Sequence, residues 1–336
     1  MNNYYHFLRQ ILFTLPPEFS HDFTLRCLEI LAEWKCIKPP INNTPPIKIL
    51  GLEFPNCMGA AAGIDKDGDY IQGIAALGFG FIELGTVTPK PQIGNPKPRL
   101  FRLTEDEAII NRMGFNNKGV DYLVNKIQQL EHNNTIIGIN IGKNASTPLE
   151  RAIDDYSYCL KVAYPWANYI TVNISSPNTS GLRDLQQGSA LVELLSALKQ
   201  QQKEITEETQ VYKPLLVKIA PDLTDDQVKT IAEQLHALQI DGVIATNTTI
   251  SREALINKNH VSETGGLSGR PLMQQSTHVI QVLRNALGKD FPIIAVGGIL
   301  SAEDAKIKLA AGADLLQVYT GLIYRGPKLV KEILRS

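Results

Sequence analysis

The chain has 336 residues, with 33 lysines and arginines against 34 aspartates and glutamates, a formal net charge of -1 and 43% hydrophobic residues. This balance argues against a nucleic-acid-binding protein, which needs a cationic surface, and against intrinsic disorder. The four cysteines lack CxxC spacing and the six histidines form no HxH or HExxH pair, so we expect a cytosolic-side enzyme without a protein-ligated metal.

Residues 1–38 are predicted to form a helical hairpin. Apolar side chains recur at helical spacing between residues 4 and 15, and Pro16 and Pro17 then end the first helix. Ser20 is predicted to cap a second helix, whose apolar face would consist of Phe23, Cys27, Ile30, Leu31 and Trp34. Both helices are too short to span a bilayer, because a span needs about 20 apolar residues.

Two interpretations of this hairpin are open. The simpler one packs its apolar face on the core, and the residues alone favour it. The other places the hairpin in a membrane surface, around an apolar groove. The charged residues of this segment cancel, so membrane binding would depend on apolar insertion; they are Arg9, Arg26, Lys35 and Lys38 against Glu18, Asp22, Glu29 and Glu33.

The remainder is predicted to be a (β/α)8 TIM barrel over residues 47–336, after a proline-rich linker at 39–46 and beginning with a small hairpin around Gly51. Its apolar runs are continuous, as in strands buried on both faces of a parallel sheet, and they alternate with amphipathic stretches. These runs are 58–61, 79–84, 136–141, 169–174, 215–219, 242–245, 293–296 and 315–319. An open doubly wound sheet is the alternative, but it usually carries a GxGxxG turn after its first strand, where this chain has none.

Polar residues follow almost every predicted strand. In a barrel these positions face the active site. Asparagine ends the third and fourth strands and follows the sixth, at Asn140, Asn173 and Asn247. Carboxamides donate and accept hydrogen bonds, so a ring of them suits a neutral heterocycle with alternating C=O and N–H groups.

Small residues after the seventh and eighth strands indicate a phosphate site. Gly297-Gly298 and Tyr319-Thr320-Gly321 lie where barrels commonly hold a phosphate with backbone N–H groups. Two ordinary tight turns remain an alternative interpretation of the same residues.

Two lysines, Lys66 and Lys218, lie at predicted inward positions, where burial is costly unless an anion is near. Lys218 could form a Schiff base with a carbonyl substrate, as in barrel lyases. Alternatively, both cations could stabilise negative charge on a reduced flavin and on a substrate carboxylate. The asparagine ring favours the flavin.

Five motifs together resemble the quinone-dependent, membrane-associated class (class 2) of the dihydroorotate dehydrogenase family, and the resemblance extends over essentially the whole chain. They are Ala62-Gly63-Ile64-Asp65-Lys66, Gly85-Thr86-Val87-Thr88-Pro89, Asn111-Arg112-Met113-Gly114-Phe115-Asn116-Asn117, Asn173-Ile174-Ser175-Ser176-Pro177-Asn178 and Thr264-Gly265-Gly266-Leu267-Ser268-Gly269.

The resemblance implies oxidation of (S)-dihydroorotate to orotate in de novo pyrimidine (UMP) biosynthesis, with one non-covalent FMN per chain and a quinone as acceptor. Ser176 would be the catalytic base. FMN would contact Ala62, Gly63, Ile64, Asp65, Lys66, Thr86, Asn140, Asn173, Lys218, Thr246, Gly269, Gly298, Tyr319 and Thr320. Substrate would contact Lys66, Asn111, Arg112, Met113, Gly114, Phe115, Asn173, Asn178, Asn247 and Thr248.

The same resemblance gives the hairpin a role as an apolar quinone tunnel, lined by His21, Arg102 and Tyr319. It implies a monomer, peripheral to the cytoplasmic face of the inner (cell) membrane. Gly181 and Gly188 indicate a loop at 179–188, which is predicted to cover the substrate. The alternatives are a soluble fumarate- or NAD-linked dehydrogenase, which would have cysteine at position 176, a Schiff-base lyase, and a non-enzymatic membrane scaffold.

Overall fold

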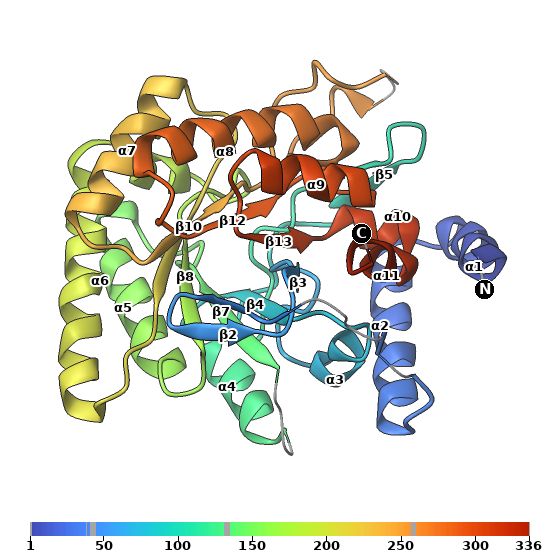
Figure 1. Ribbon diagram of the computed structural model, residues 1–336, viewed down its shortest axis with the longest axis horizontal. Helices are drawn as coiled ribbons and strands as arrows, with labels where there is room; N and C mark the ends of the chain where they lie inside the picture. Colours follow the sequence, from blue (N-terminus) through green and yellow to red (C-terminus); the bar gives the residue numbers. More distant parts are fainter. Residues whose placement is uncertain (1, 38, 41–44, 131–134, 257–259, 336) are drawn as a thin grey trace.

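The computed structural model describes residues 2–37, 39–40, 45–130, 135–256 and 260–335, with side chains from residue 5 onward; residues 41–44 of the predicted linker lie outside these ranges. Eight parallel strands close into a barrel in the order β10-β12-β13-β3-β4-β7-β8-β9 (Figure 1). The predicted (β/α)8 barrel is therefore confirmed. The strands are β3 (Met58–Ala60), β4 (Phe81–Val87), β7 (Ile136–Ile141), β8 (Tyr169–Asn173), β9 (Leu215–Ile219), β10 (Gly242–Ala245), β12 (Ile293–Val296) and β13 (Leu315–Val318).

Helices cover the outside of the barrel, as Figure 1 shows. All eight predicted apolar runs are barrel strands, because each is buried on both faces by side chains inside the barrel and by helices outside it. The helices are α3 (Ile71–Ala75), α4 (Val120–Gln128), α5 (Ala152–Ala163), α6 (Gly188–Thr209), α7 (Asp225–Ala237), α8 (Met273–Leu287), α9 (Ala302–Ala310), α10 (Thr320–Arg325) and α11 (Lys328–Ile333).

Aromatic side chains fill one end of the barrel interior. The hairpin of β1 (Ile47–Ile49) and β2 (Leu52–Phe54) places Phe54 edge-on to Phe81, with ring centroids 5.2 Å apart. A Cβ at Gly59 would collide with the Phe81 ring, and one at Gly138 would collide with Tyr169. Glycine is needed at both positions because the rings occupy the space that a side chain would take. These rings close this end of the barrel. The polar residues that follow the strands lie at the opposite end.

A three-stranded antiparallel sheet stands outside the barrel and was not predicted. It pairs β5 (Leu100–Leu103), β6 (Ala108–Asn111) and β11 (Gly266–Gly269), with Asn111 aligned to both Leu100 and Gly266. These strands have only four residues each, and β11 follows β6 by more than 150 residues, so local sequence pattern does not reveal the sheet. The sheet places Asn111 beside Gly266 and Gly269 beside Ala108.

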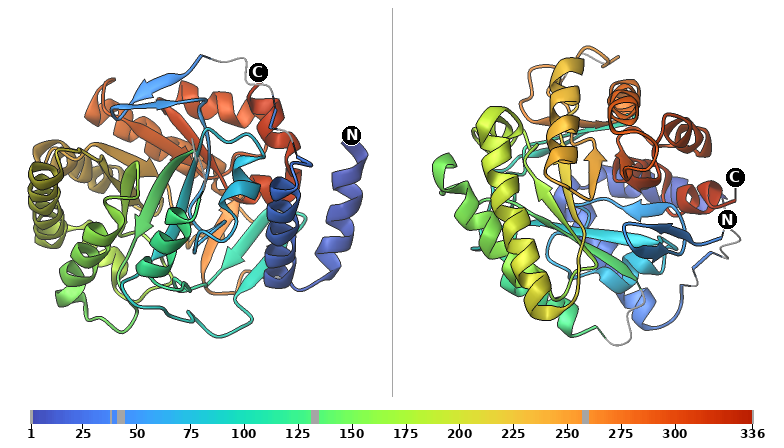
Figure 2. Two further views of the ribbon diagram at one scale, coloured as in Figure 1. Left: turned by 90° about the horizontal axis from the view of Figure 1, so that it is seen from below. Right: turned by 60° about the vertical axis from the view of Figure 1, so that its left-hand side comes forward.

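Two N-terminal helices, α1 (Asn2–Thr14) and α2 (Pro17–Glu33), lie together on one side of the barrel (Figure 2). The predicted cap at Ser20 is wrong, because α2 begins at Pro17, three residues earlier. Proline is favoured there since its missing N–H would be unpaired in any helix. The Ser20 hydroxyl instead donates to the Leu12 carbonyl at 2.7 Å, which holds the turn between the two helices.

The polar side of α1 is attached to the barrel. Tyr5 donates its hydroxyl to the Ile323 carbonyl at 2.7 Å, Arg9 donates to the Tyr324 carbonyl at 2.8 Å, and Arg102 donates to the carbonyls of Leu12 and Leu15. The apolar side faces outward. The simpler interpretation, with this face packed on the core, is therefore wrong for Phe7, Leu8, Ile11, Phe19, Phe23, Ile30, Leu31 and Trp34, which are exposed.

Candidate active site

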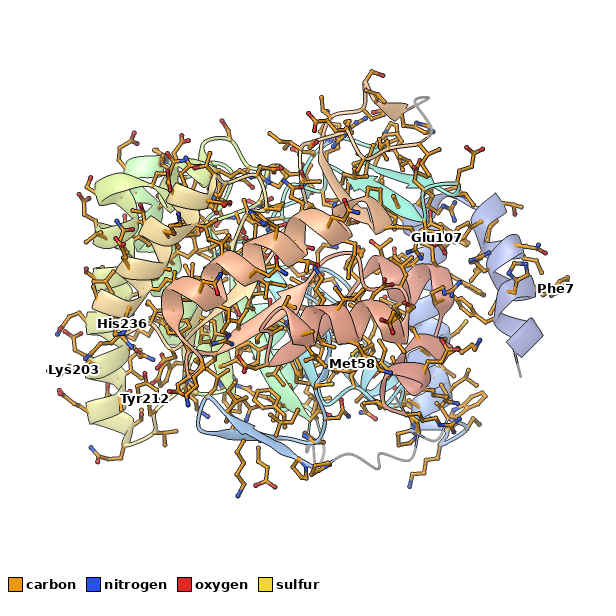
Figure 3. All side chains as sticks on the ribbon, turned by 45° about the horizontal axis from the view of Figure 1, so that its top comes forward. Phe7, Met58, Glu107, Lys203, Tyr212 and His236 are labelled. Carbon is orange, nitrogen blue, oxygen red and sulfur yellow. The ribbon has the colours of Figure 1, made fainter. Side chains whose placement is uncertain are left out.

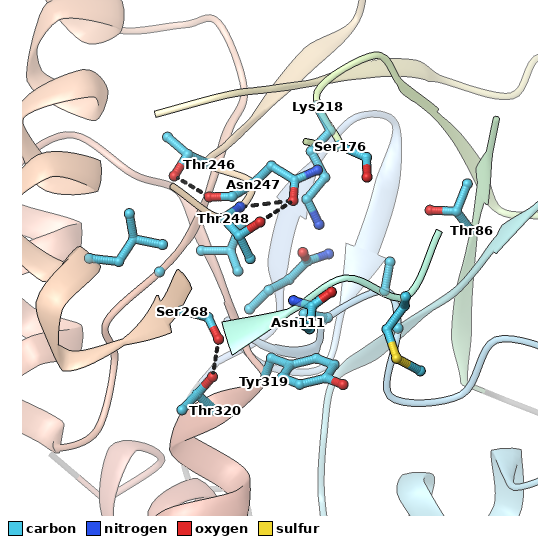
Figure 4. A pocket seen from close by; sticks show the side chains of 18 of the residues that line it. Thr86, Asn111, Ser176, Lys218, Thr246, Asn247, Thr248, Ser268, Tyr319 and Thr320 are labelled. Atoms are coloured by element: carbon cyan, nitrogen blue, oxygen red, sulfur yellow. Dashed lines mark hydrogen bonds between the residues drawn. The ribbon is translucent and has the colours of Figure 1, made fainter. Parts of the chain in front are cut away.

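A cavity of about 1000 Å³, part of it open to solvent, lies at the carboxyl ends of the barrel strands (Figure 4). It gathers residues that are up to 260 positions apart in the chain, because the parallel strands all end on this side. Most of the predicted site residues line it: Ala62, Gly63, Lys66, Thr86, Asn111, Met113, Gly114, Phe115, Asn173, Ser176, Asn178, Lys218, Thr246, Asn247, Thr248, Gly269, Gly298, Tyr319 and Thr320.

Four predicted site residues do not line this cavity. Ile64 is buried beside it, and the Asp65 carboxylate accepts backbone N–H groups from the loop before α3, including those of Gly68 and Tyr70 at 2.8 Å. Arg112 pairs with Glu263 at 2.6 Å. Asn140 is fully buried behind the cavity wall. Asp65 and Arg112 therefore shape loops at this site.

Carboxamides form a connected network across the strand ends. Asn173 donates to the Thr86 hydroxyl at 2.8 Å and to the Asn140 side-chain oxygen at 3.1 Å. Asn247 in turn donates to the Asn173 side-chain oxygen at 3.2 Å and to the Ser175 hydroxyl at 3.0 Å. Each amide is held in one orientation by its neighbours, so the cavity wall presents fixed donors and acceptors.

Glu83, which is fully buried in β4, lies beneath this network and was missed in the sequence analysis. Its carboxylate accepts hydrogen bonds from Asn140 at 2.8 Å and Gln317 at 2.9 Å, and its Oε1 lies 4.0 Å from the Lys218 Nζ. Tyr169 and Thr171 also donate to it, both at 3.2 Å. A glutamate inside an otherwise apolar strand was the available signal, because such a group must have partners.

Buried Lys218 and partly buried Lys66 both line the cavity. Lys218 is 6% exposed, and burial lowers the pKa of its ammonium group while the Glu83 carboxylate opposes the shift. Burial also lowers the pKa of Lys66, whose Nζ donates to the Gly63 carbonyl at 3.2 Å. Gln317, beside Lys218, has a buried side-chain oxygen without a partner in the described part of the chain. The floor of the cavity can therefore accept a further hydrogen bond from a bound ligand.

The other end of the cavity is built from glycines and hydroxyls. Gly269, Gly297 and Gly298 line it with φ angles of 97°, 124° and 80°, which favour glycine. The hydroxyls of Ser268 and Thr320 lie 2.8 Å apart at the same end, as Figure 4 shows. This arrangement leaves backbone close to the cavity, as a phosphate cradle needs.

Ser176 lies in the cavity wall directly after β8, and its side chain is labelled in Figure 4. The residue is 6% exposed, and its hydroxyl oxygen accepts the Asn178 N–H at 3.3 Å. Asn178 also donates its side-chain amide to Asn111, at 3.1 Å to both the backbone and the side-chain oxygen. Asn111 comes from β6 of the outer sheet, so that sheet and β8 together form this part of the site.

Comparison with known proteins identifies this arrangement. Residues 46–336 match the family model described as Dihydroorotate dehydrogenase. The chain belongs to the dihydroorotate dehydrogenase family. It is 54% identical to the dihydroorotate dehydrogenase (quinone) of Herminiimonas arsenicoxydans, over 98% of this chain and 96% of that protein. It is 52% identical to that of Acinetobacter baylyi, over 99% of both.

Solved structures agree with this assignment. The crystal structure of the Eimeria tenella dihydroorotate dehydrogenase in complex with ferulenol superimposes with a TM-score of 0.86 at 38% identity, covering 95% of this chain and 90% of that one. The chain is thus an enzyme, a dihydroorotate dehydrogenase of the quinone-dependent class, and this class is flavin-dependent and membrane-associated. Within the described residues no group of three or more His, Cys, Asp or Glu side chains could hold a metal ion.

A second cavity of this dehydrogenase lies between α2 and the barrel and shares Lys66, Met113 and Tyr319 with the first. His21 also lines it, so two of the three predicted tunnel residues, His21 and Tyr319, meet here. Arg102 does not line this cavity; besides its hydrogen bonds to α1, its guanidinium lies 4.6 Å from the Phe13 ring centroid. The structure therefore places Arg102 under the hairpin.

The pKa of His21 is lowered to about 4, chiefly by burial and then by the Lys66 charge. Because the unfolded chain has the ordinary His pKa of about 6.5, it binds a proton between pH 6.5 and 4 that the folded state does not. Stability contributed by neutral His21 is therefore present above pH 6.5 and lost as pH falls toward 4. Through His21 the wild type should lose up to about 2 kcal/mol of its free energy of unfolding between pH 7 and 5, and His21→Gln should not show this part of the loss. Urea unfolding at both pH values measures this, with His236→Gln at an exposed position as the control.

Proposed function

We propose that the enzyme oxidises (S)-dihydroorotate to orotate in de novo pyrimidine biosynthesis, with one non-covalently bound FMN per chain and a membrane quinone as electron acceptor. The observation that carries this proposal is the grouping of Ser176, the Asn111–Asn178 pair and Lys66 around one cavity whose floor holds Lys218.

The residues present fit FMN. Lys218 would offer a buried positive charge to the polar edge of the isoalloxazine ring, and the Gln317 side-chain oxygen, which has no partner among the described residues, lines the same cavity. Gly269, Gly298 and Thr320 would hold the phosphate at the other end. When bound, FMN supplies at its N5 position the acceptor for the hydride that leaves C6 of the substrate.

The chain's own side chains would orient the substrate. Carboxamides of Asn111, Asn178 and Asn247 can pair with the alternating C=O and N–H groups of the dihydropyrimidine ring. Lys66 is the cation that remains for the substrate carboxylate, and burial strengthens such a pair. Together these contacts would hold the ring between Ser176 and the flavin.

Ser176 is the proposed base, which removes the C5 proton. A serine hydroxyl is a poor base in water, so it needs help from the site. Thr179 has a buried hydroxyl with no hydrogen-bond partner among the described residues, and it is three positions away. Thr248, the other hydroxyl considered, is held by the side-chain oxygen of Asn247 at 3.4 Å. We therefore favour Thr179 over Thr248 as the helper.

One experiment tests the reaction. The purified protein should be yellow, with an FMN spectrum that anaerobic dihydroorotate bleaches and a ubiquinone analogue restores. Restoration by fumarate or NAD but not by the quinone would support the soluble alternative. A colourless protein that borohydride inactivates in the presence of a carbonyl substrate would support the Schiff-base lyase through Lys218, and failure of both assays would favour the membrane scaffold.

We further propose that residues 1–38 form the quinone entrance, 39–46 a linker and 47–336 the FMN-binding barrel, in a monomer at the cytoplasmic face of the cell membrane. Exposed apolar side chains of α1, of α2 and of Trp34 directly after α2 support the membrane contact, with Phe7 64% and Trp34 72% exposed. Figure 3 shows Phe7 pointing outward at the edge of the molecule. No helix in the described ranges is long and apolar enough to cross a bilayer.

Replacing both Phe7 and Trp34 by serine should weaken binding to phosphatidylcholine vesicles at least about tenfold, because each buried aromatic contributes roughly 1.5–3 kcal/mol. The charges of this segment cancel, so binding should also change little with salt. Vesicle co-sedimentation measures both. Val211→Ser is a matched control, since Val211 is exposed and adjoins Tyr212, which Figure 3 shows on the opposite side from Phe7. Equal binding of the double variant and wild type would contradict the proposal.

A further inference from the structure

One buried lysine has no role in the site described so far. Lys308 lies in α9, and its side chain is completely buried between α9 and α8. Its Nζ donates to the Ser276 hydroxyl at 2.5 Å and to the Met273 carbonyl at 3.2 Å. The Asp304 carboxylate on the same helix acts electrostatically on this ammonium group. Both hydrogen-bond acceptors of the group are neutral and its burial is costly, so a further anion nearby would stabilise it.

Both partners of Lys308 contact the glycine turn at the end of the main cavity. Ser276 Oγ lies 3.1 Å from the Gly297 carbonyl oxygen, and a Cβ at Gly297 would lie 2.9 Å from that hydroxyl. A Cβ at Gly298 would lie 2.6 Å from the Met273 nitrogen. Lys308 therefore reaches each glycine of the turn through one intervening residue, which is Ser276 for Gly297 and Met273 for Gly298. The turn separates it from the cavity.

We propose that Lys308 is a positioning residue for the FMN phosphate, with its buried ammonium supplying positive charge behind the Gly297–Gly298 turn and holding that turn through Ser276 and Met273. This inference rests on the proposed binding of FMN in this cavity. The phosphate would then be a second anion acting on Lys308 besides the Asp304 carboxylate, and the charge would act across buried protein, where it is little screened.

Burial makes the charge state of Lys308 sensitive to a nearby anion. Burial lowers the pKa of Lys308 to about 7, and the Asp304 carboxylate on the same helix opposes the shift. Asp304 is itself engaged by the Leu300 N–H at 2.9 Å. A phosphate dianion in front of the turn would favour the charged form of the lysine, and the charged lysine would favour the dianion.

Neutral variants of the flavin-loaded enzyme test the proposal. Lys308→Met removes the charge and the hydrogen bonds, whereas Lys308→Gln removes the charge but keeps a donor for Ser276. Lys306→Met is the matched control, because Lys306 lies on the same helix and is exposed. FMN release after dilution, followed by flavin fluorescence, should be about tenfold faster in both Lys308 variants and unchanged in the control.

A second measurement separates charge from structure. In 31P NMR of the bound flavin, the ionisation midpoint of the phosphate should rise in both Lys308 variants, because the nearby cation stabilises the dianion. If Lys308→Met does not fold, the release rate and the phosphate midpoint of Lys308→Gln, compared with wild type, test the proposal. Release rates and midpoints equal to wild type would overturn this inference while leaving the proposed function intact. Wild-type protein that purifies without FMN would instead overturn the proposed function, and this inference with it.

Discussion

Ser176→Ala should lower turnover by about 10²–10⁴-fold while the protein retains its flavin, because removal of a positioned base costs this much. Ser176 is part of the wall of the main cavity, and its hydroxyl accepts the Asn178 N–H at 3.3 Å. Loss of the hydroxyl should therefore affect proton removal from C5 and leave the barrel and the carboxamide network in place. Anaerobic stopped-flow reduction of the flavin by dihydroorotate measures the affected step directly.

Two further variants sharpen this test. Ser189→Ala changes an exposed serine at the start of α6 and should leave the rate unaltered. Ser176→Cys should recover part of the lost rate, and more of it as the pH rises toward the thiol's ordinary pKa of about 8.5, since the thiolate is a stronger base than a hydroxyl. A Ser176→Ala enzyme that reduces its flavin at nearly the wild-type rate would show that another group removes the proton.

Glu83→Ala should lower the free energy of unfolding by about 3–5 kcal/mol, the usual cost of removing one member of a buried ion pair. Lys218 would lose its charged partner, and Asn140, Gln317, Tyr169 and Thr171 would lose the acceptor of a hydrogen bond. Urea unfolding of wild type and variant gives the difference.

The same substitution at an exposed pair is the control. Glu53 pairs with Lys48 at 3.7 Å on the surface, and Glu53→Ala should change stability by less than about 0.5 kcal/mol. Glu83→Gln keeps the shape but loses the charge, so its effect should lie between the two. Equal stability of Glu83→Ala and Glu53→Ala would mean that the buried network contributes nothing to folding.

The barrel and most of its site were predictable from the sequence. Strands buried on both faces are recognisable as continuous apolar runs, and the residue after each run is then assigned to the active end. Long motifs such as Asn173–Asn178 then indicated the dihydroorotate dehydrogenase family. These features are local, so a single stretch of chain is enough to reveal each of them.

Other parts of the site depend on contacts between distant segments. Glu83 and Gln317 are polar residues in apolar strands, but only closure of the barrel shows that they meet each other and Lys218. The sheet of β5, β6 and β11 also depends on contacts between distant segments. Its strands pair across more than 150 residues, and Asn111 at the end of β6 lies beside Asn178.

The barrel, the class of enzyme and most cavity-lining residues could be inferred from the amino-acid sequence, because they depend on local patterns and motifs. Tertiary structure decided which face of the N-terminal hairpin is exposed, and what lies behind the cavity wall. The physical reason is that amphipathic spacing specifies that a helix has an apolar side but not what covers it. In α1 that choice follows from the bonds of Tyr5, Arg9 and Arg102, which hold its polar side against the barrel.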